Sequence, residues 1–261
     1  MIQSGSKNLF KKLVRLNDKK ARNESGLFVV EGEKFVKDIG YGFDITEYIF
    51  SEGYLAKNDF AAFDHLNSNI CHVFSDDDFA RISDTVTPQG ILAVVKQKTY
   101  SFNDIISNDD PFIIIGENIN DPGNMGTVIR TADACGCDGV VFTEQSADIY
   151  NPKVIRSTAG SLCHLPVIQG QSLLDVVSIL KQHQVKIIAA SLKGEFLPYD
   201  VNLSRGVAIL LGNESGGLTI EAEEMADVLV KIPMVGKAES LNASVAGGVL
   251  MYEVVRQRLM S

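Results

Sequence analysis

The sequence lacks several features that define common classes of protein. It contains no Trp, and its four cysteines show neither a zinc-ligand pairing nor the Cys-x-x-Cys redox spacing. No apolar stretch reaches the length of a membrane-spanning helix, and the basic N-terminal segment leads into no signal-peptide apolar region. We therefore expect a soluble, cytoplasmic protein with reduced thiols, no metal and no membrane partner.

Familiar catalytic and phosphate-binding motifs are also missing. The sequence has no G-x-G-x-x-G and no G-x-x-x-x-G-K-[ST], which argues against an ordinary dinucleotide-binding fold and against a nucleotide hydrolase. Ser215 lies in Gly-Asn-Glu-Ser-Gly-Gly, which does not match the G-x-S-x-G nucleophile spacing. The four histidines are scattered, so neither a metal site nor a catalytic triad is expected.

The charges that are present are unevenly distributed. The chain of 261 residues has a net charge of −9, yet residues 1–37 carry nine Lys/Arg against four acids, and the remainder therefore carries −14. A basic first helix on an acidic body fits a local contact with nucleic-acid phosphates, with Lys11, Lys12, Lys19 and Lys20 as the candidate binding residues. The same charges also fit a solvated helix face, and the charge pattern alone does not separate the two interpretations.

The pattern of apolar residues predicts two α/β domains joined by a polar linker. Residues 1–97 alternate short helices and strands, residues 98–110 form the linker, and residues 111–261 form the second domain. In the first domain we expect a helix from about Leu9 that ends before Gly26, further helices at 33–39, 59–66 and 76–82, and strands at 27–30, 45–50, 70–74 and 91–95.

The second domain has a repeating strand-helix order, which is typical of a parallel sheet. We expect strands at 112–115, 140–142, 186–190, 207–211 and 228–232, and helices at 127–135, 152–159, 173–183 and 219–226. Ligands of such sheets bind at the carboxyl ends of the strands. Three loops at predicted strand ends, 116–126, 212–218 and 233–244, are therefore candidates for a site.

The segment 232–258 has the most unusual composition. After a strand that ends at Pro233, Ser240 is a good N-cap for a long helix that is apolar on nearly every side as far as Val255. Such a helix is expected to be buried by its own domain and by a second subunit. Ser240, Asn242 and Ser244 place small polar groups at alternate positions of the predicted first turn. The segment therefore predicts a ligand-binding wall.

Together the three loops resemble the three motifs of the SpoU (TrmH) family of RNA 2′-O-ribose methyltransferases, in the SPOUT superfamily. The first motif resembles NMGTVIRTADACG, with Asn124 and Arg130 at the family spacing. The second resembles LLGNESGGL, with Gly212 and Glu214, and the third resembles the segment 232–258. The three motifs occur in the family's order over about 150 residues.

The resemblance implies an α/β domain whose parallel sheet contains a deep trefoil knot, with S-adenosyl-L-methionine as cofactor. The positions that match the family's adenosine contacts are Gly212, Ile232 and Leu241, with Ser191, Leu211 and Met234 nearby. Backbone groups would read the neutral edge of the adenine while apolar walls enclose it.

By the same resemblance Arg130 is the catalytic residue. Since a guanidinium stays protonated in proteins, we expect Arg130 to hold an RNA phosphate and to stabilise the developing alkoxide, while phosphate or water takes the proton. Asn124, Glu214, Ser240 and Asn242 are expected to position Arg130 and the ribose. Family members are homodimers, which agrees with the apolar last helix.

The N-terminal half resembles the substrate-binding domain of one branch of the family, in EGEKFVKD (31–38) and TPQGILAVV (87–95). That domain is similar to ribosomal proteins that bind RNA kink-turns, which favours ribosomal RNA as substrate because structured RNA is recognised by shape. Two alternatives stay open: transfer RNA as the substrate, and an RNA-binding or ribosome-assembly factor that keeps the fold without catalysis. Retention of Arg130, Glu214 and Asn242 favours the enzyme.

Overall fold

The computed structural model describes residues 2–40, 42–58 and 68–260. They form two compact units. The N-terminal unit comprises Met1–Lys98 and Tyr150–Cys163, and the C-terminal unit comprises Thr99–Ile149 and His164–Ser261. The sequence predicts one division of the chain, at residues 98–110. In the structure the chain also returns to the N-terminal unit for residues 150–163.

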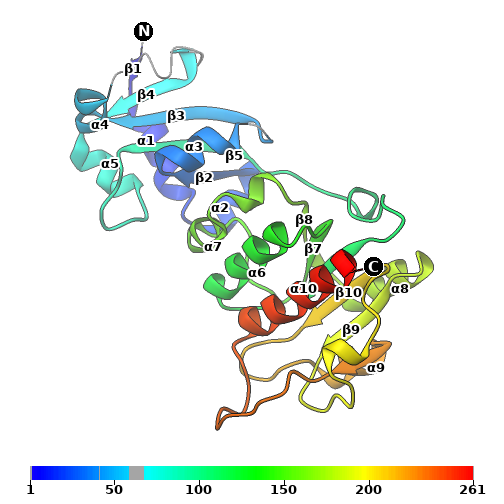
Figure 1. Ribbon diagram of the computed structural model, residues 1–261. Coiled ribbons are helices and arrows are strands. Elements are labelled where there is room, and N and C mark those ends of the chain that lie inside the picture. The colour runs from blue at the N-terminus through cyan, green and yellow to red at the C-terminus, as the bar shows by residue number, and fades with distance from the viewer. Residues whose placement is uncertain (1, 41, 59–67, 261) are drawn as a thin grey trace. The chain divides into compact units, whose positions relative to one another are not determined.

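A mixed sheet forms the centre of the N-terminal unit. Its strands are β1 (Gln3–Ser4), β2 (Leu27–Glu31), β3 (Ile45–Ser51), β4 (Cys71–Phe74) and β5 (Ile91–Lys96). They lie in the order β1-β4-β3-β5-β2 (Figure 1). The pairs β1–β4 and β4–β3 are parallel, whereas β5 is antiparallel to both β3 and β2.

The helices of this unit that fall within the described residues are short. They are α1 (Lys7–Arg15), α2 (Lys19–Ser25), α3 (Glu33–Ile39), α4 (Glu52–Lys57), α5 (Asp76–Ile82) and α7 (Pro152–Thr158). The prediction of one helix before Gly26 was wrong, because the Asp18 carboxylate accepts the Lys20 N–H at 2.7 Å and caps a second helix. Neither α4 nor β1 was predicted, and the helix predicted at 59–66 lies outside the described residues.

Helix α7 comes from the middle of the predicted second domain but packs against β2. The ring of Tyr150, just before α7, lies 4.6 Å from the ring of Phe28, centroid to centroid. The Tyr150 hydroxyl accepts the Lys98 N–H at 3.0 Å and donates to the Lys98 carbonyl at 2.9 Å. The Arg156 guanidinium pairs with Asp84 at 2.6 Å. Residues 150–163 are thus an integral part of the N-terminal unit.

The C-terminal unit contains a parallel sheet. Its strands are β6 (Phe112–Gly116), β7 (Gly139–Thr143), β8 (Val167–Gln171), β9 (Lys186–Ala190), β10 (Val207–Leu211) and β11 (Val228–Val230), in the order β11-β9-β10-β6-β7-β8 (Figure 1). All five neighbouring pairs are parallel. The predicted α/β class with a parallel sheet is confirmed, although β8 was not predicted and β11 is two residues shorter than expected. The knot stays a prediction.

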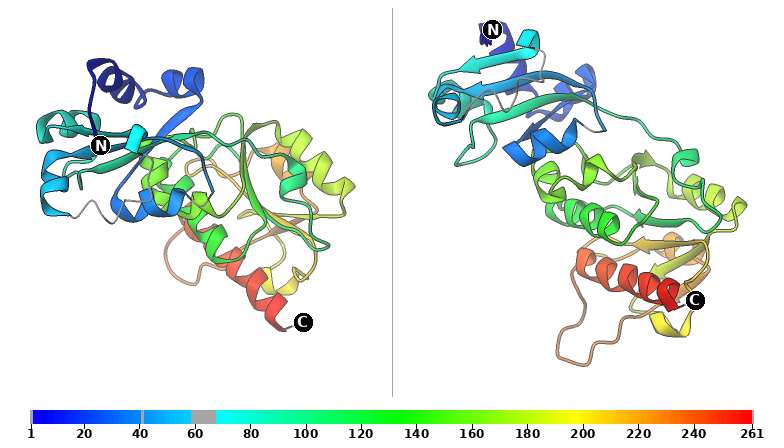
Figure 2. Two further views of the ribbon diagram at one scale, coloured as in Figure 1. Left: turned by 90° about the horizontal axis from the view of Figure 1, so that it is seen from above. Right: turned by 45° about the horizontal axis from the view of Figure 1, so that its top comes forward.

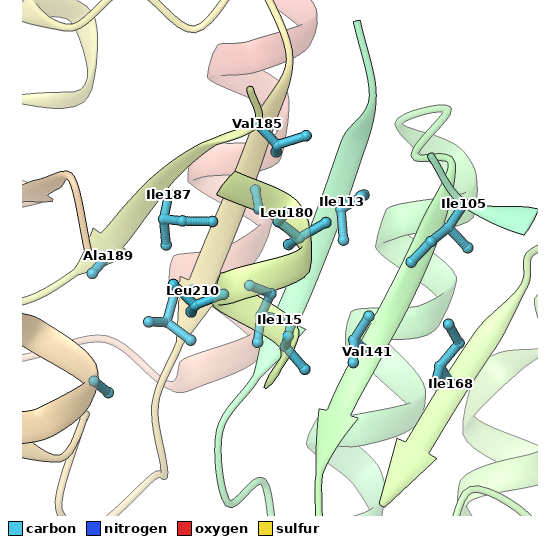
Figure 3. Packing of buried hydrophobic residues seen from close by; sticks show 14 residues of the cluster. Ile105, Ile113, Ile115, Val141, Ile168, Leu180, Val185, Ile187, Ala189 and Leu210 are labelled. Carbon is cyan, nitrogen blue, oxygen red and sulfur yellow. The ribbon is translucent and has the colours of Figure 1, made fainter. Parts of the chain in front are cut away.

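Helices cover both faces of this sheet. They are α6 (Pro122–Ala134), α8 (Leu173–Gln182), α9 (Ile220–Met225) and α10 (Ala243–Met260). Figure 3 shows the core on one face, where Leu180 from α8 reaches Ile113, Ile115 and Leu210 on the strands. Because side chains alternate along a strand, Ile114 and Ile209 point to the opposite face, where α6 and α10 pack side by side.

A long loop joins β11 to α10 and extends beyond the sheet (Figure 2). Residues 235–242 of this loop are exposed. The prediction that Ser240 caps the last helix was wrong. Helix α10 begins at Ala243, and the Asn242 side-chain oxygen accepts the N–H groups of Ser244 at 2.9 Å and Val245 at 3.3 Å. Ser240 and Asn242 are both good capping types, and the tertiary position of Asn242 decides between them.

Candidate active site

The loops after β6 and β10 are joined to each other at the centre of the sheet. The Glu117 N–H donates to the Leu211 carbonyl at 2.8 Å, which continues the strand pairing by one residue. The Glu117 side chain is 5% exposed, and its oxygens accept the Thr219 hydroxyl at 2.6 Å and the Thr219 N–H at 3.0 Å. Asn213 donates its amide to the Asn118 carbonyl at 2.7 Å. These bonds fix the two loops in one geometry.

A cavity of about 330 Å³ lies at the carboxyl ends of β9, β10 and β11. Apolar side chains form much of its wall, and backbone from the loop 212–218 forms another part. All six residues predicted to bind the cofactor line it: Ser191, Leu211, Gly212, Ile232, Met234 and Leu241. Two predicted catalytic residues, Glu214 and Ser240, line it as well. The structure therefore brings together positions that lie up to 50 residues apart in the chain.

Gly212 is required at its position by close packing of the loop. An added Cβ would overlap the backbone of Gly217 and Leu218. Asn213 and Gly217 exchange backbone hydrogen bonds of 2.9 Å in both directions, so the loop folds back on itself as a tight two-stranded bridge. Any side chain at position 212 would open this bridge and deform the cavity wall.

One end of the cavity carries a charged pair that the sequence analysis does not name. Glu223 accepts the Ser191 hydroxyl at 2.6 Å and the Lys193 ammonium at 2.7 Å, and all three residues line the cavity. Hydrogen bonds from Lys193 and then Ser191 hold the pKa of Glu223 below its ordinary value of 4.5. In sequence Glu223 is one of several acids on α9, and no local signal distinguishes it.

A chain of polar side chains links the three loops. Asn242 donates its amide to Asn124 Oδ1 at 2.9 Å, and Asn124 donates its own amide to Glu214 Oε1 at 2.9 Å. Ser244, which is 6% exposed, lies with its hydroxyl 2.7 Å from Asn242 Oδ1 and 3.3 Å from Asn124 Oδ1. The structure thus brings Asn124, Glu214 and Asn242 into contact, as members of one hydrogen-bonded chain.

Arg130 lies apart from that chain. It is exposed on α6, six residues after Asn124, which corresponds to about 9 Å along a helix axis. It does not line the cavity. Within the described part of the protein Arg130 has no hydrogen-bond or ion-pair partner. Its guanidinium is therefore available to a ligand, and its catalytic role stays a prediction.

The four lysines predicted to bind RNA lie on α1 and α2. Lys11 and Lys19 are exposed and have no ion-pair partner among the described residues. Lys12 lies 3.9 Å from Glu47, and Lys20 lies 3.9 Å from Glu24. Acidic neighbours therefore partly compensate two of the four charges, and the RNA-binding role of this face stays a prediction.

In residues 2–40, 42–58 and 68–260, no group of three or more His, Cys, Asp and Glu side chains could hold a metal ion. No helix within the same ranges is long and apolar enough to span a membrane.

Family comparisons assign each part of the chain. Residues 111–252 match the SpoU rRNA Methylase family, and residues 7–93 match the MRM3-like substrate binding domain. The chain is 33% identical over 257 residues to the 23S rRNA (guanosine(2553)-2'-O)-methyltransferase RlmP of Bacillus subtilis, covering 97% of this chain and 98% of that protein.

Solved structures of related proteins match this fold over nearly the whole chain. The SpoU methyltransferase AviRb from Streptomyces viridochromogenes, solved with the cofactor AdoMet, superposes with a TM-score of 0.89 and 26% identity, covering 98% of this chain and 99% of AviRb. An AdoMet-bound rRNA methyltransferase from Sinorhizobium meliloti superposes with a TM-score of 0.83 and 26% identity, covering 98% and 97%. With its three motifs after β6, β10 and β11 and its matched domains, this chain belongs to the SpoU rRNA methylase family.

Proposed function

We propose that this protein transfers a methyl group from S-adenosyl-L-methionine to a ribose 2′-hydroxyl in structured RNA, with ribosomal RNA as the substrate. The cavity at the ends of β9, β10 and β11 is the observation that carries the proposal, because it collects every residue expected to contact the cofactor. Membership of the family supports the reaction type. The names of RlmP and of the Sinorhizobium meliloti enzyme support ribosomal RNA over transfer RNA.

The residues of the cavity fit this cofactor. Leu211, Ile232 and Leu241 provide apolar surface for an adenine ring, and the volume of about 330 Å³ lies within the range of small-molecule sites. The close approach of backbone at Gly212 suits recognition by N–H and C=O groups. The ionised Glu223 can accept hydrogen bonds from ribose hydroxyls or from an ammonium group. When bound, the cofactor supplies an activated methyl group on a sulfonium.

The protein's own task is to make the ribose hydroxyl reactive. A guanidinium stays protonated in proteins, so Arg130 is not a candidate for the base. We assign it to hold an RNA phosphate with its planar fork and to stabilise the oxygen as its proton leaves for phosphate or water. Its exposure and lack of partners among the described residues agree with a group that is completed by the substrate.

The outer face of α10 supports a homodimer. Val245, Val249 and Tyr252 follow one another at helical spacing and are 51%, 44% and 58% exposed, and Leu241 at the cavity wall is 36% exposed. An exposed apolar helix face of this kind suits a second copy of the chain, which would then adjoin the cavity. We also propose that the protein is cytoplasmic, in keeping with a ribosomal RNA substrate.

The full-length protein should first bind S-adenosylmethionine in a calorimeter and sediment with the mass of a dimer. It should then transfer labelled methyl groups to ribosomal RNA, but not to transfer RNA, both isolated from a strain that lacks the gene. Mapping should place the label on one ribose 2′-oxygen. Absence of cofactor binding by folded protein would eliminate the methyltransferase. Binding without transfer to either RNA would favour a non-catalytic RNA-binding factor.

A further inference from the structure

The hydrogen bonds between Asn242, Asn124 and Glu214 can run in only one direction, from donor to acceptor. At its first end Asn242 accepts the backbone N–H groups of Ser244 and Val245. A backbone N–H can only donate, so the accepting atom must be the amide oxygen of Asn242. The Asn242 nitrogen is therefore the atom that faces Asn124, at 2.9 Å.

The other end imposes the same direction independently. The second residue, Asn124, must present its oxygen to the Asn242 nitrogen, which leaves its own nitrogen to face Glu214 Oε1 at 2.9 Å. The Glu214 carboxylate oxygen is the acceptor of this bond, so it faces the Asn124 nitrogen. Both ends thus fix the orientations of the two amides, and the bond dipoles run head to tail from the N-terminus of α10 to Glu214.

Ser244 contacts both amides. Its hydroxyl is buried between Asn242 Oδ1 and Asn124 Oδ1, and its single proton serves both oxygens. A hydroxyl can also accept, so the orientation of the amides is fixed by the backbone N–H groups of Ser244 and Val245 and not by the Ser244 hydroxyl. The Ser244 hydroxyl ties the two side chains to each other and so holds them in position.

We propose that Ser244, Asn242 and Asn124 form a one-way hydrogen-bonded relay that holds the Glu214 carboxylate at the wall of the cofactor cavity, and that Ser244 is a positioning residue for methyl transfer. This inference rests on the proposed function. Glu214 Oε2 has no partner among the described residues, so it can accept a hydrogen bond from the substrate or cofactor. The relay serves Glu214 and has no bond to Arg130 within the described chain.

The direction of the relay can be tested by reversing it. Asn242→Asp keeps a good cap for α10 but has no donor for Asn124. Asn124 must then turn its nitrogen toward position 242, which sets its oxygen against the carboxylate of Glu214. Adding Glu214→Gln supplies a donor for that oxygen and satisfies the reversed chain. Glu214→Gln alone keeps the original direction, because the glutamine oxygen still accepts from Asn124.

We therefore expect a specific coupling in the thermal unfolding midpoint. Asn242→Asp should lower the midpoint by about 2–4 °C in the wild-type background, the shift that corresponds to one lost hydrogen bond, and by clearly less when Glu214→Gln is present. Equal shifts in the two backgrounds would overturn the relay. This measurement needs neither cofactor nor RNA, so it tests the relay even if the proposed reaction is wrong.

The positioning role of Ser244 has its own test. Ser244→Ala should reduce the single-turnover rate of methyl transfer by roughly 10-fold while cofactor affinity stays unchanged, and Ser244→Thr, which keeps a hydroxyl, should recover much of that rate. Ser157→Ala is the control, since it removes a helical serine hydroxyl in the N-terminal unit, where that hydroxyl donates to the Lys153 carbonyl. An unchanged rate in Ser244→Ala, or equal losses for Ala and Thr in folded protein, would refute this role.

Discussion

The candidate site of the C-terminal unit and the basic helices of the N-terminal unit hold their functional groups in different ways. Around the cavity, Glu214 and Glu223 are each oriented by hydrogen bonds of 2.6 to 2.9 Å from neighbouring side chains. On α1 and α2, Lys11 and Lys19 are exposed with no ion-pair partner among the described residues, and Lys12 and Lys20 approach acids only to 3.9 Å.

This difference predicts that substitutions affect function differently in the two regions. Where geometry is fixed by several bonds, one substitution that keeps the charge but changes the shape is expected to cause a large loss. Where flexible charges meet phosphates, each lysine contributes a small and salt-dependent amount, and the total matters more than any one residue. Substitutions that conserve charge therefore separate the two regions most directly.

The largest effect is expected at Arg130. Arg130→Lys keeps the positive charge but loses the two-pronged geometry, and Arg130→Ala loses both. If the fork holds phosphate and ribose, both variants should lose roughly 100-fold or more in single-turnover methyl transfer, the scale for removal of a transition-state donor. Cofactor affinity, measured by calorimetry, should be unchanged because Arg130 does not line the cavity.

The two Arg130 variants also show whether this residue depends on geometry or on charge alone. A lysine variant that recovers most of the rate would place Arg130 with the charge-dependent residues, whose geometry is not critical. Near-normal turnover by the alanine variant would show that another residue performs the catalytic step.

Most strands of the sheet were predictable from the sequence, because they depend on local signals. Phe112–Ile115 is apolar at every position, as a strand buried on both faces requires, and β6 forms there. The strand order was not predicted, and it is the pairing of β10 with β6 that brings loops 116–126 and 212–218 together. Their contacts through Glu117 and Asn213 follow from that arrangement.

Other features depend on tertiary contacts that leave no local signal. The apolar residues of α7 would look the same whether they packed on their own sheet or, as they do, on β2 of the N-terminal unit. Glu223 is an ordinary helical acid until folding places Ser191 and Lys193 beside it. The position of α7 also has a practical consequence: a fragment that starts near residue 109 would leave Tyr150 without Phe28, so the full chain is the correct sample.

An intermediate effect is expected from the basic helices. Reversing the charge at Lys11, Lys12, Lys19 and Lys20 should weaken RNA binding and flatten its dependence on salt. If all four contact phosphates, the slope of log K against log salt should fall in magnitude by roughly 3, by analogy with single-stranded nucleic acid. Filter binding across salt concentrations measures the slope, and cofactor affinity should be unaffected because the cavity residues belong to the C-terminal unit.

A second quadruple variant provides the control for net charge. Reversal at Lys57, Lys96, Lys181 and Lys186 changes the total charge by the same amount, but at positions outside α1 and α2. Equal losses of RNA affinity in the two variants would mean that bulk charge, and not the basic helices, controls binding. Single Lys→Arg changes on α1 and α2 should have little effect, in contrast to Arg130→Lys.

The smallest effect is expected at Glu223, where geometry and charge act together. Hydrogen bonds from Lys193 and Ser191 lower the pKa of Glu223, so the ionised form is favoured in the folded protein. The stability that this adds is fully present above the pKa of the unfolded chain, about 4.5, and is lost as the pH falls through the lowered pKa of the folded protein. Glu223→Gln should therefore lower the unfolding midpoint at pH 7 by about 1–3 °C, a modest shift because Lys193 is largely exposed to solvent. The difference from wild type should shrink below pH 4.5.

Glu224→Gln on the same helix is the control, since Glu224 is exposed and has no ion-pair partner in the described chain. A Glu223→Gln deficit that persists unchanged at low pH would show that shape, and not charge, is what Glu223 contributes.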